Sequence, residues 1–273
     1  MRHKTVEFNA ERNVTLEVCA FNLAKQDAPE SPFDQRRPAI IICPGGGYEF
    51  LSEREADPIA IAFQRFGFQC FILRYSIREH STFPNPAVDA ARSVRWVRAN
   101  AEELGIDPER VTVLGFSAGG HVTALIGTKH DDPAVLEAER AEYDDLFEFS
   151  SRPDAIVPCY AVFSLDWKNE FEQSSIMATN TIDAVGPHVP PAFVWTTGED
   201  ELVPASQSLR FVNALAEAGV PFEYHHFAHG EHGLSTSDSL SCGPEKPTPE
   251  NAHTWIELCA RWLRATFEGR NAG

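Results

Sequence analysis

Short apolar runs alternate with amphipathic stretches along most of this chain. The runs, which are rich in β-branched and aromatic residues, predict buried strands over residues 39–43, 68–75, 111–114, 155–162, 191–197 and 220–227. Helical spacing is clearest in the stretch that opens at Asn85-Pro86, whose apolar face comprises Ala87, Ala91, Val94, Val97, Ala101 and Leu104. Strands that alternate with helices predict an α/β protein with a mostly parallel sheet covered by helices on both faces.

The chain before residue 39 follows a different pattern. Residues 4–8 and 14–23 read as two strands, and in the second of them apolar residues alternate with polar ones. Such alternation is typical of a half-exposed antiparallel pair, so we expect these strands to extend the sheet. The proline-containing residues 25–38 predict a surface loop.

Two later segments show no clear helical or strand pattern. Residues 130–153 are acidic and predict a solvated excursion on the surface. Residues 164–190 lie near the predicted cleft by chain position, which makes them a candidate small lid or substrate-contacting loop. Because no linker divides the chain, we expect a single domain over residues 1–273.

Charge and composition narrow the class of partner. The formal net charge of −17 disfavours nucleic acid or an anionic membrane, because like charges repel. No stretch approaches the roughly 20 apolar residues of a membrane helix, and residues 1–12 have no apolar core like a signal peptide. The six cysteines show no paired spacing, which predicts reduced, mostly buried thiols in a cytoplasmic protein. The oligomeric state, a homo-oligomer included, stays open.

One glycine-rich turn carries a candidate nucleophile. The sequence from Gly115 to Gly119 reads G-F-S-A-G and lies between the apolar strand that ends at Leu114 and an expected helix. In that context G-x-S-x-G is the signature of a nucleophile elbow. Glycines on both sides of Ser117 remove side chains that would clash in so tight a turn, which leaves the serine oxygen exposed at the end of the strand.

A serine nucleophile needs a base in contact with it and an acid that orients the base. The chain order expected for a nucleophile elbow is serine, acid, histidine. Asp200 lies in the loop after a predicted strand, where a carboxylate can point over the edge of the sheet, and it is the favoured acid. Glu199 and Glu201 are its local competitors.

Four histidines offer candidates for the base. His225 and His226 lie within the last predicted strand and face opposite sides, so a structural role suits them better. His232, in the loop beyond that strand, is the favoured base, and His229 is the runner-up. A metal site built from these histidines and Glu231 is disfavoured, because the spacing matches no recognised ligand set.

Acyl transfer also requires hydrogen-bond donors for the oxyanion. The N–H of Ala118, directly after the nucleophile, is one expected donor. The glycines at 45–47 follow an earlier strand and stand in the place of the second donor. Gly46 is the favoured residue there, and Gly47 comes next.

Aromatic residues near these loops are candidates to line a pocket. Tyr48 and Tyr160 are predicted to bind substrate. Phe50 and Trp167 are weaker candidates, because a place in the core or on the surface explains them at least as well.

Together these motifs resemble the α/β-hydrolase superfamily, in particular small bacterial esterases related to acetyl xylan esterases (BD-FAE) and the acetylesterase branch of the hormone-sensitive-lipase-like group. The resemblance spans residues 38–265 and rests on C-P-G-G-G-Y at 43–48, G-I-D-P-E-R-V at 105–111, G-F-S-A-G-G-H at 115–121, G-E-D-E-L-V-P at 198–204 and G-E-H-G at 230–233. It implies an α/β-hydrolase fold with a minimal lid, Ser117 as nucleophile, Asp200 as acid and His232 as base. It also implies deacylation of small acyl esters, often acetylated sugars, with no cofactor.

Two features depart from the lipase-like group. Pro44 stands where that group has a histidine that supports the oxyanion loop, so we expect the geometry of this loop to differ. The long N-terminal cap of the group is also lacking, which predicts a more open cleft.

The α/β-hydrolase motifs also raise the alternatives of an amide hydrolase, a non-catalytic binding protein and a glycosidase. An amide or formamide hydrolase, such as a peptidase or an aryl formamidase, uses the same triad, and these motifs cannot separate it from an esterase. A non-catalytic binding protein on the same fold is disfavoured, because such proteins usually lose a triad member. A glycosidase is not indicated, because no carboxylate pair at the end of a barrel strand can be argued.

Overall fold

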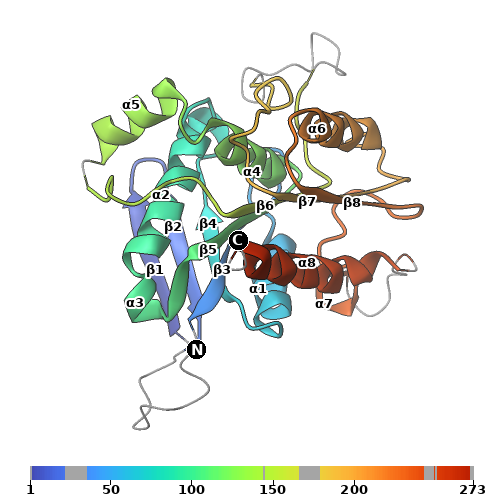
Figure 1. The fold of residues 1–273 in the computed structure, drawn as a ribbon, viewed down its shortest axis with the longest axis horizontal. Helices are drawn as coiled ribbons and strands as arrows, with labels where there is room; N and C mark the ends of the chain where they lie inside the picture. Colours follow the sequence, from blue (N-terminus) through green and yellow to red (C-terminus); the bar gives the residue numbers. More distant parts are fainter. Residues whose placement is uncertain are drawn as a thin grey trace.

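In the part of the chain that the structure describes, eight strands form one sheet through the middle of the molecule (Figure 1). This computed structural model describes residues 2–21, 36–143, 145–165, 179–242, 249 and 251–270. The strand order is β1-β2-β4-β3-β5-β6-β7-β8. The strands are β1 (Arg2–Asn9), β2 (Val14–Ala20), β3 (Arg37–Cys43), β4 (Gln69–Arg74), β5 (Ile106–Phe116), β6 (Ala155–Cys159), β7 (Ala192–Thr197) and β8 (Phe222–Phe227). β2 pairs antiparallel with both β1 and β4, and the other neighbouring strands pair in parallel, so the predicted mostly parallel sheet is confirmed.

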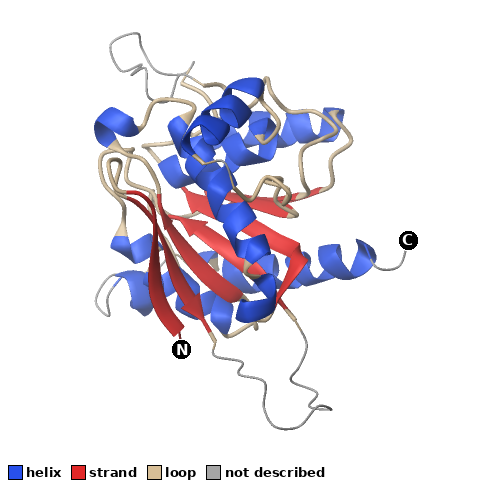
Figure 2. Cartoon of the chain, turned by 90° about the vertical axis from the view of Figure 1, so that its left-hand side faces the viewer, coloured by secondary structure: helices blue, strands red, loops and turns tan. Residues whose placement is uncertain are grey.

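Helices cover both faces of this sheet (Figures 1 and 2). One face carries α1 (Asp57–Gln64) and α8 (Trp255–Arg270), and the other carries α2 (Asn85–Ala99), α4 (Ala118–Lys129) and α6 (Ala205–Glu217). The shorter elements are η1 (Glu53–Glu55), η2 (Arg78–His80), α3 (Ala101–Leu104), α5 (Pro133–Glu142), α7 (Ser239–Cys242) and η4 (Ala252–Thr254). The helix predicted over 85–104 is divided at Asn100 into α2 and α3.

The central strand β3 shows why its sequence is apolar throughout. Ile40 and Ile42 lie in the hydrophobic cluster that includes α1 and α8, whereas Ile41 lies in the cluster that includes α2 and α4. All three isoleucines are fully buried. Successive side chains of a strand point to opposite faces, so a strand covered by helices on both faces needs apolar residues at every position.

Most described residues of the acidic stretch 130–153 are exposed or half-buried, as predicted, but part of the stretch packs against neighbouring helices. The stretch contains helix α5, which begins after the cap residue Asp132. Its Glu139 is buried and pairs with Arg95 of α2 at 2.9 Å. Val135 of the same helix packs in a small hydrophobic cluster with α2 and α4. The segment is therefore a surface segment whose helix α5 packs inward through Val135 and Glu139, and Arg95 of α2 pairs with the buried Glu139 carboxylate.

The cysteines and the helices bear on two further predictions. The structure shows five buried, free thiols, at Cys19, Cys43, Cys70, Cys159 and Cys259, as the lack of paired spacing predicted. Among the helices of the described ranges, none combines the length and the apolar character that crossing a bilayer requires.

The parallel strands bring several loops to one edge of the sheet. β3, β5, β6, β7 and β8 run in the same direction, so the segments that follow them all leave at their carboxyl ends. In open α/β sheets this edge is where ligands bind. The glycines at 45–47, named here the oxyanion loop after the role predicted for them, and the candidates Ser117, Asp200 and His232 each follow one of these strands.

Candidate active site

Ser117 occupies the sharp turn between β5 and α4. Its backbone has φ 52° and ψ −113°, a conformation that non-glycine residues rarely adopt and that often marks functional sites. A Cβ on Gly119 would lie 2.0 Å from the Cys43 carbonyl oxygen, and one on Gly115 would lie 2.1 Å from the Gly119 carbonyl oxygen. Such distances are sterically impossible, so both glycines of the motif are required for this turn.

A chain of two hydrogen bonds connects the predicted acid, base and nucleophile. His232 Nδ1 lies 2.7 Å from Asp200 Oδ2, and His232 Nε2 lies 2.9 Å from Ser117 Oγ. The carboxylate is the acceptor of the Nδ1 proton, which leaves Nε2 to accept the serine proton. The side chain of Asp200 is fully buried and that of His232 is 17% exposed. The structure thus brings together the three residues that the sequence proposed.

Asp200 is fixed by its own loop as well as by His232. Its Oδ1 accepts the N–H groups of Leu202 at 3.0 Å and Val203 at 2.8 Å. One carboxylate oxygen is therefore held by the backbone while the other is directed at the imidazole. This arrangement fixes the carboxylate that orients His232.

The competing residues lie elsewhere. Glu199 Oε1 lies 2.9 Å from His229 Nδ1, so the alternative acid and the alternative base contact each other on the surface. Glu201 and His226 are exposed, and His225 lies 2.7 Å from Glu223. Among the residues that the structure describes, no group of histidine, cysteine and carboxylate side chains has the arrangement of a metal site.

The oxyanion loop follows β3 and lies beside the nucleophile turn. Gly46 has φ 132°, and a Cβ at this position would lie 2.0 Å from the Phe50 carbonyl oxygen. Gly46 is partly buried, whereas Gly47 is exposed. Within the described ranges, no hydrogen bond engages the N–H of Gly46, Gly47 or Ala118. These three N–H groups are therefore unpaired in the described part of the chain.

Tyr48 differs from the substrate-binding role predicted for it. Its side chain is fully buried, and its hydroxyl lies 2.8 Å from His121 Nδ1. His121 Nε2 lies 2.9 Å from the Thr179 carbonyl oxygen, which can only accept, so Nε2 carries the proton and Nδ1 accepts from Tyr48. Burial lowers the pKa of His121 to about 4, which is consistent with this neutral form. Tyr48 is thus a core residue whose hydroxyl is already hydrogen-bonded to His121.

Tyr160 differs from its prediction in a similar way. It is 1% exposed, and its hydroxyl donates to Glu55 Oε1 at 2.6 Å. Its ring meets the His232 imidazole edge to face, with 5.1 Å between centroids and 70° between planes. Tyr160 therefore supports the candidate base and does not line an open wall. Phe50 is 58% exposed beside the oxyanion loop. Trp167 and residues 166–178 of the candidate lid lie outside the described residues.

Comparison with known proteins places this fold and site in a family. A family model described as BD-FAE matches residues 28–215. The chain belongs to the BD-FAE family. The crystal structure of MGS-M1, an α/β-hydrolase from a deep-sea metagenome library, is 33% identical and covers 98% of either chain with a TM-score of 0.81. The α/β-hydrolase fold is therefore confirmed.

Two further relatives carry names that mention xylan chemistry. An acetyl ester-xyloside bifunctional hydrolase from Caldicellulosiruptor lactoaceticus is 32% identical, with 93% of this chain and 88% of that chain covered and a TM-score of 0.76. Endo-1,4-beta-xylanase B of Butyrivibrio fibrisolvens is 31% identical over 75% of this chain and 34% of its own length. This BD-FAE chain spans between 34% and 51% of the length of several curated relatives.

The BD-FAE chain supports its oxyanion loop without a histidine at position 44. The Tyr75 hydroxyl donates to the Pro44 carbonyl oxygen at 2.6 Å, and the Gly45 N–H donates to Glu55 Oε2 at 2.8 Å. Sequence reasoning missed both Tyr75 and Glu55. No sequence motif points to Tyr75 or Glu55, because each residue lies outside the glycine motif whose backbone it contacts.

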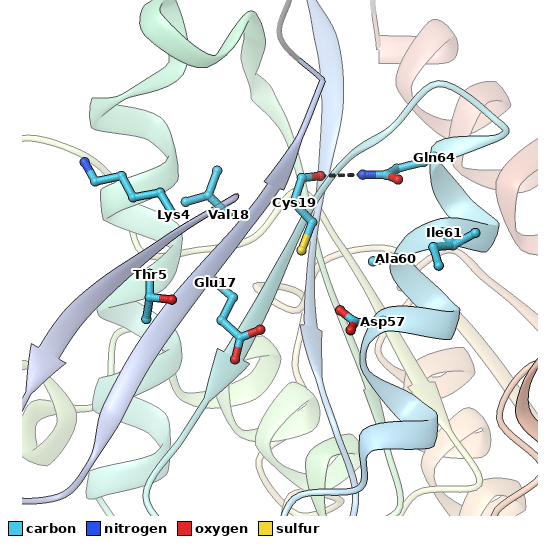
Figure 3. Close-up of a pocket in the computed structure, with 9 residues that line it drawn as sticks. All are labelled: Lys4, Thr5, Glu17, Val18, Cys19, Asp57, Ala60, Ile61 and Gln64. Carbon is cyan, nitrogen blue, oxygen red and sulfur yellow. Dashed lines mark hydrogen bonds between the residues drawn. The ribbon is translucent and has the colours of Figure 1, made fainter. Parts of the chain in front are cut away.

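A separate cavity of about 400 Å³ lies between β1, β2 and α1 (Figure 3). Glu17 and Cys19 contribute from β2, and Asp57 and Gln64 contribute from α1. The Gln64 amide bridges the two elements by donating to the Cys19 carbonyl oxygen at 2.5 Å. None of the triad residues lines this cavity, so it is distinct from the candidate active site of this BD-FAE protein.

Proposed function

We propose that this chain is a serine carboxylesterase that hydrolyses short-chain acyl esters, with acetyl esters of sugars or xylo-oligosaccharides as its substrates. The hydrogen-bonded chain from Asp200 through His232 to Ser117 carries this proposal. The same three groups in the same order act in serine hydrolases on unrelated folds, where geometry and not sequence position defines the role.

The geometry supports a two-step mechanism. Ser117 Oγ attacks the ester carbonyl carbon while His232 Nε2 accepts the serine proton, and Asp200 stabilises the imidazolium that forms. The N–H groups of Ala118 and Gly46 hold the negative oxygen of the tetrahedral intermediate. His232 then gives the proton to the departing alcohol, which leaves an acyl group on Ser117. Water attacks this acyl-enzyme by the same proton transfers in reverse order and releases the acid.

Two observations support acetylated sugars as the substrate class. One solved relative is named an acetyl ester-xyloside bifunctional hydrolase, and one curated relative is named a xylanase. The described part of the chain supplies a triad for acyl transfer, which is the chemistry of removing acetyl groups. The proposal therefore assigns to this chain the esterase part of such activities.

The test compares hydrolysis of p-nitrophenyl acetate, butyrate and octanoate with release of acetate from acetylated xylo-oligosaccharides. Ser117→Ala is assayed beside Ser206→Ala, which alters an exposed serine on α6. We expect Ser117→Ala to lose activity by at least about 10³-fold and Ser206→Ala to match the wild type. Full activity in Ser117→Ala would overturn the mechanism. A wild type that ignores every ester but cleaves N-formylkynurenine or a dipeptide amide would replace the esterase with an amide hydrolase.

A further inference from the structure

Glu55 is a buried carboxylate that the triad does not use. It lies at the end of η1, is 3% exposed, and contacts two loops of the candidate active site. Its Oε2 accepts the Gly45 N–H at 2.8 Å, and its Oε1 accepts the Tyr160 hydroxyl at 2.6 Å. One side chain thus holds the start of the oxyanion loop and the segment that follows β6.

The directions of the hydrogen bonds indicate an ionised carboxylate. The Ser235 N–H donates to the Tyr160 hydroxyl oxygen at 3.0 Å, so the phenol directs its own proton at Glu55. Both contacts of Glu55 are then donors, and a carboxylate that receives two donors needs no proton of its own. Burial raises the pKa of Glu55 above its ordinary value, and the Tyr160 hydroxyl, the Gly45 N–H and the positive form of His232 offset only part of that rise.

The same network reaches the candidate base. The Tyr160 ring contacts the His232 imidazole, and Tyr160 also receives the N–H of Ser235, three residues beyond His232. The Ser235 hydroxyl donates to the Arg54 carbonyl oxygen. The carbonyl oxygen of Ser235 accepts the Trp255 indole N–H at 2.9 Å. The loop that carries His232 is therefore attached to the same turn that holds the oxyanion loop.

Gly45 gives an independent sign of this arrangement. A Cβ at Gly45 would lie 2.7 Å from Glu55 Oε2 and 2.8 Å from the Phe116 carbonyl oxygen. Gly45 is thus required because a side chain there would collide with Glu55 and with the strand that carries the nucleophile.

We propose that Glu55 is a positioning residue, an ionised carboxylate that keeps the oxyanion loop and the His232 loop in register and stabilises the imidazolium form of His232. This inference rests on the proposed acyl-transfer function. During attack on the ester His232 becomes positive, and a fixed negative charge nearby favours that state. Three other charged residues lie near His232: Asp200 in the loop after β7, Arg54 in the turn beside Glu55, and Glu231 in the loop of His232 itself. The variants described below leave all three unchanged.

The experiment measures kcat and KM for p-nitrophenyl acetate and the pH profile of kcat/KM for four proteins. These are the wild type, Glu55→Gln, Tyr160→Phe and Glu53→Gln. Glu53 is the matched control, because it lies in the same turn but is exposed and pairs with Arg74 at 2.8 Å. Circular dichroism and thermal unfolding check that each variant is folded.

We expect Glu55→Gln to lower kcat by about 10²-fold with KM nearly unchanged, the scale of a misplaced catalytic group. The acidic limb of its profile, which reports the base of the free enzyme, should move to lower pH, because loss of a nearby anion disfavours the imidazolium. Tyr160→Phe removes one of the two donors to Glu55, so it should lower kcat and move that limb in the same direction by no more than Glu55→Gln does, whereas Glu53→Gln should match the wild type. The proposal is overturned if Glu55→Gln has a wild-type kcat or an unmoved acidic limb. If Glu55→Gln does not fold, a wild-type kcat in Tyr160→Phe overturns the proposal instead.

A second readout separates this inference from the proposed function. An alkyl fluorophosphonate reacts with an activated serine and needs no ester turnover, and mass spectrometry locates it on Ser117. If the wild type hydrolyses no ester but is labelled, the esterase proposal fails while the labelling rates still test Glu55. We expect labelling of Glu55→Gln to be about 10²-fold slower than that of the wild type and of Glu53→Gln. Equal labelling rates overturn the inference.

Discussion

Glu199 and His229 contact each other at 2.9 Å directly beside the Asp200–His232 pair. Two acid–histidine pairs thus connect the same two loops, and only one of them reaches Ser117. Glu199 also accepts the Gly230 N–H at 2.8 Å, two residues before His232. The outer pair is largely exposed and holds the loop, whereas the buried Asp200 directs its histidine at the serine.

The two histidines should therefore respond very differently to the same substitution. His232→Gln removes the only base in contact with Ser117 among the described residues, and we expect kcat for p-nitrophenyl acetate to fall by at least about 10³-fold. His229→Gln removes an exposed hydrogen bond to Glu199, for which we expect less than about a threefold change. Steady-state kinetics of the two variants decides this. A comparable loss in both would assign catalysis to the outer pair.

Asp200→Asn tests the orienting role of the acid with almost no change in shape. An amide in place of the carboxylate can donate to His232 Nδ1 and so favours the tautomer whose Nε2 carries the proton, which prevents it from accepting the serine proton. We expect kcat to fall on the order of 10⁴-fold with a far smaller change in KM. Glu201→Gln is the neighbouring control, because this carboxylate is exposed. An Asp200→Asn enzyme with near wild-type kcat would show that the imidazole is oriented by other groups.

The sequence was informative where chain order alone determines position. Parallel strands place their carboxyl ends at one edge, so a serine, an acid and a histidine that each follow a strand must come together there. Local competitors could not be separated in this way. Glu199 and Asp200 are adjacent, and only the torsions of their loop decide which carboxylate points inward.

Contacts between distant segments were beyond the reach of the sequence patterns. Glu55 and Tyr160 are 105 positions apart, and Arg95 and Glu139 are 44 positions apart. A charged residue with no visible partner reads as solvated, so the sequence pattern does not reveal that Glu139 of α5 is buried against Arg95. Tyr48 is a pocket candidate in the sequence because it is an aromatic residue near the predicted site, yet its positive φ of 64° marks a turn that leads its side chain into the core.

A buried ion pair near the N-terminus should contribute strongly to stability. Arg12 contacts Asp89 and Glu142 at 2.7 Å each, and the side chain of Asp89 is fully buried. Arg12→Met leaves Asp89 without its cation, and we expect the free energy of unfolding to fall by about 3–5 kcal/mol. Arg261→Met removes an exposed pair with Glu257 and should change it by less than about 1 kcal/mol. Urea unfolding at pH 7.5 measures both, and equal losses would refute the special role of the buried pair.

His121 should make stability depend on pH in a defined window. Its pKa is lowered from 6.5 to about 4 because it is buried, so the folded protein holds it neutral while the unfolded chain can protonate it. A depressed pKa in the folded state stabilises fully above pH 6.5, and this contribution is lost as the pH falls towards 4. Between pH 7.5 and pH 5 the loss from this one group should be about 2 kcal/mol.

The measurement that isolates His121 is the difference in unfolding free energy between the wild type and His121→Gln across that range. Other buried groups, including Glu55 and Asp89, have raised pKa values and act in the opposite sense, but they are common to both proteins and cancel in the difference. The variant lacks a titrating side chain, so its disadvantage at pH 7.5 should shrink as the pH falls. His226→Gln, an exposed histidine of β8, is the control. A difference that stays constant from pH 7.5 to pH 5 would mean that His121 can accept a proton without unfolding, which the Tyr48 and Thr179 contacts argue against.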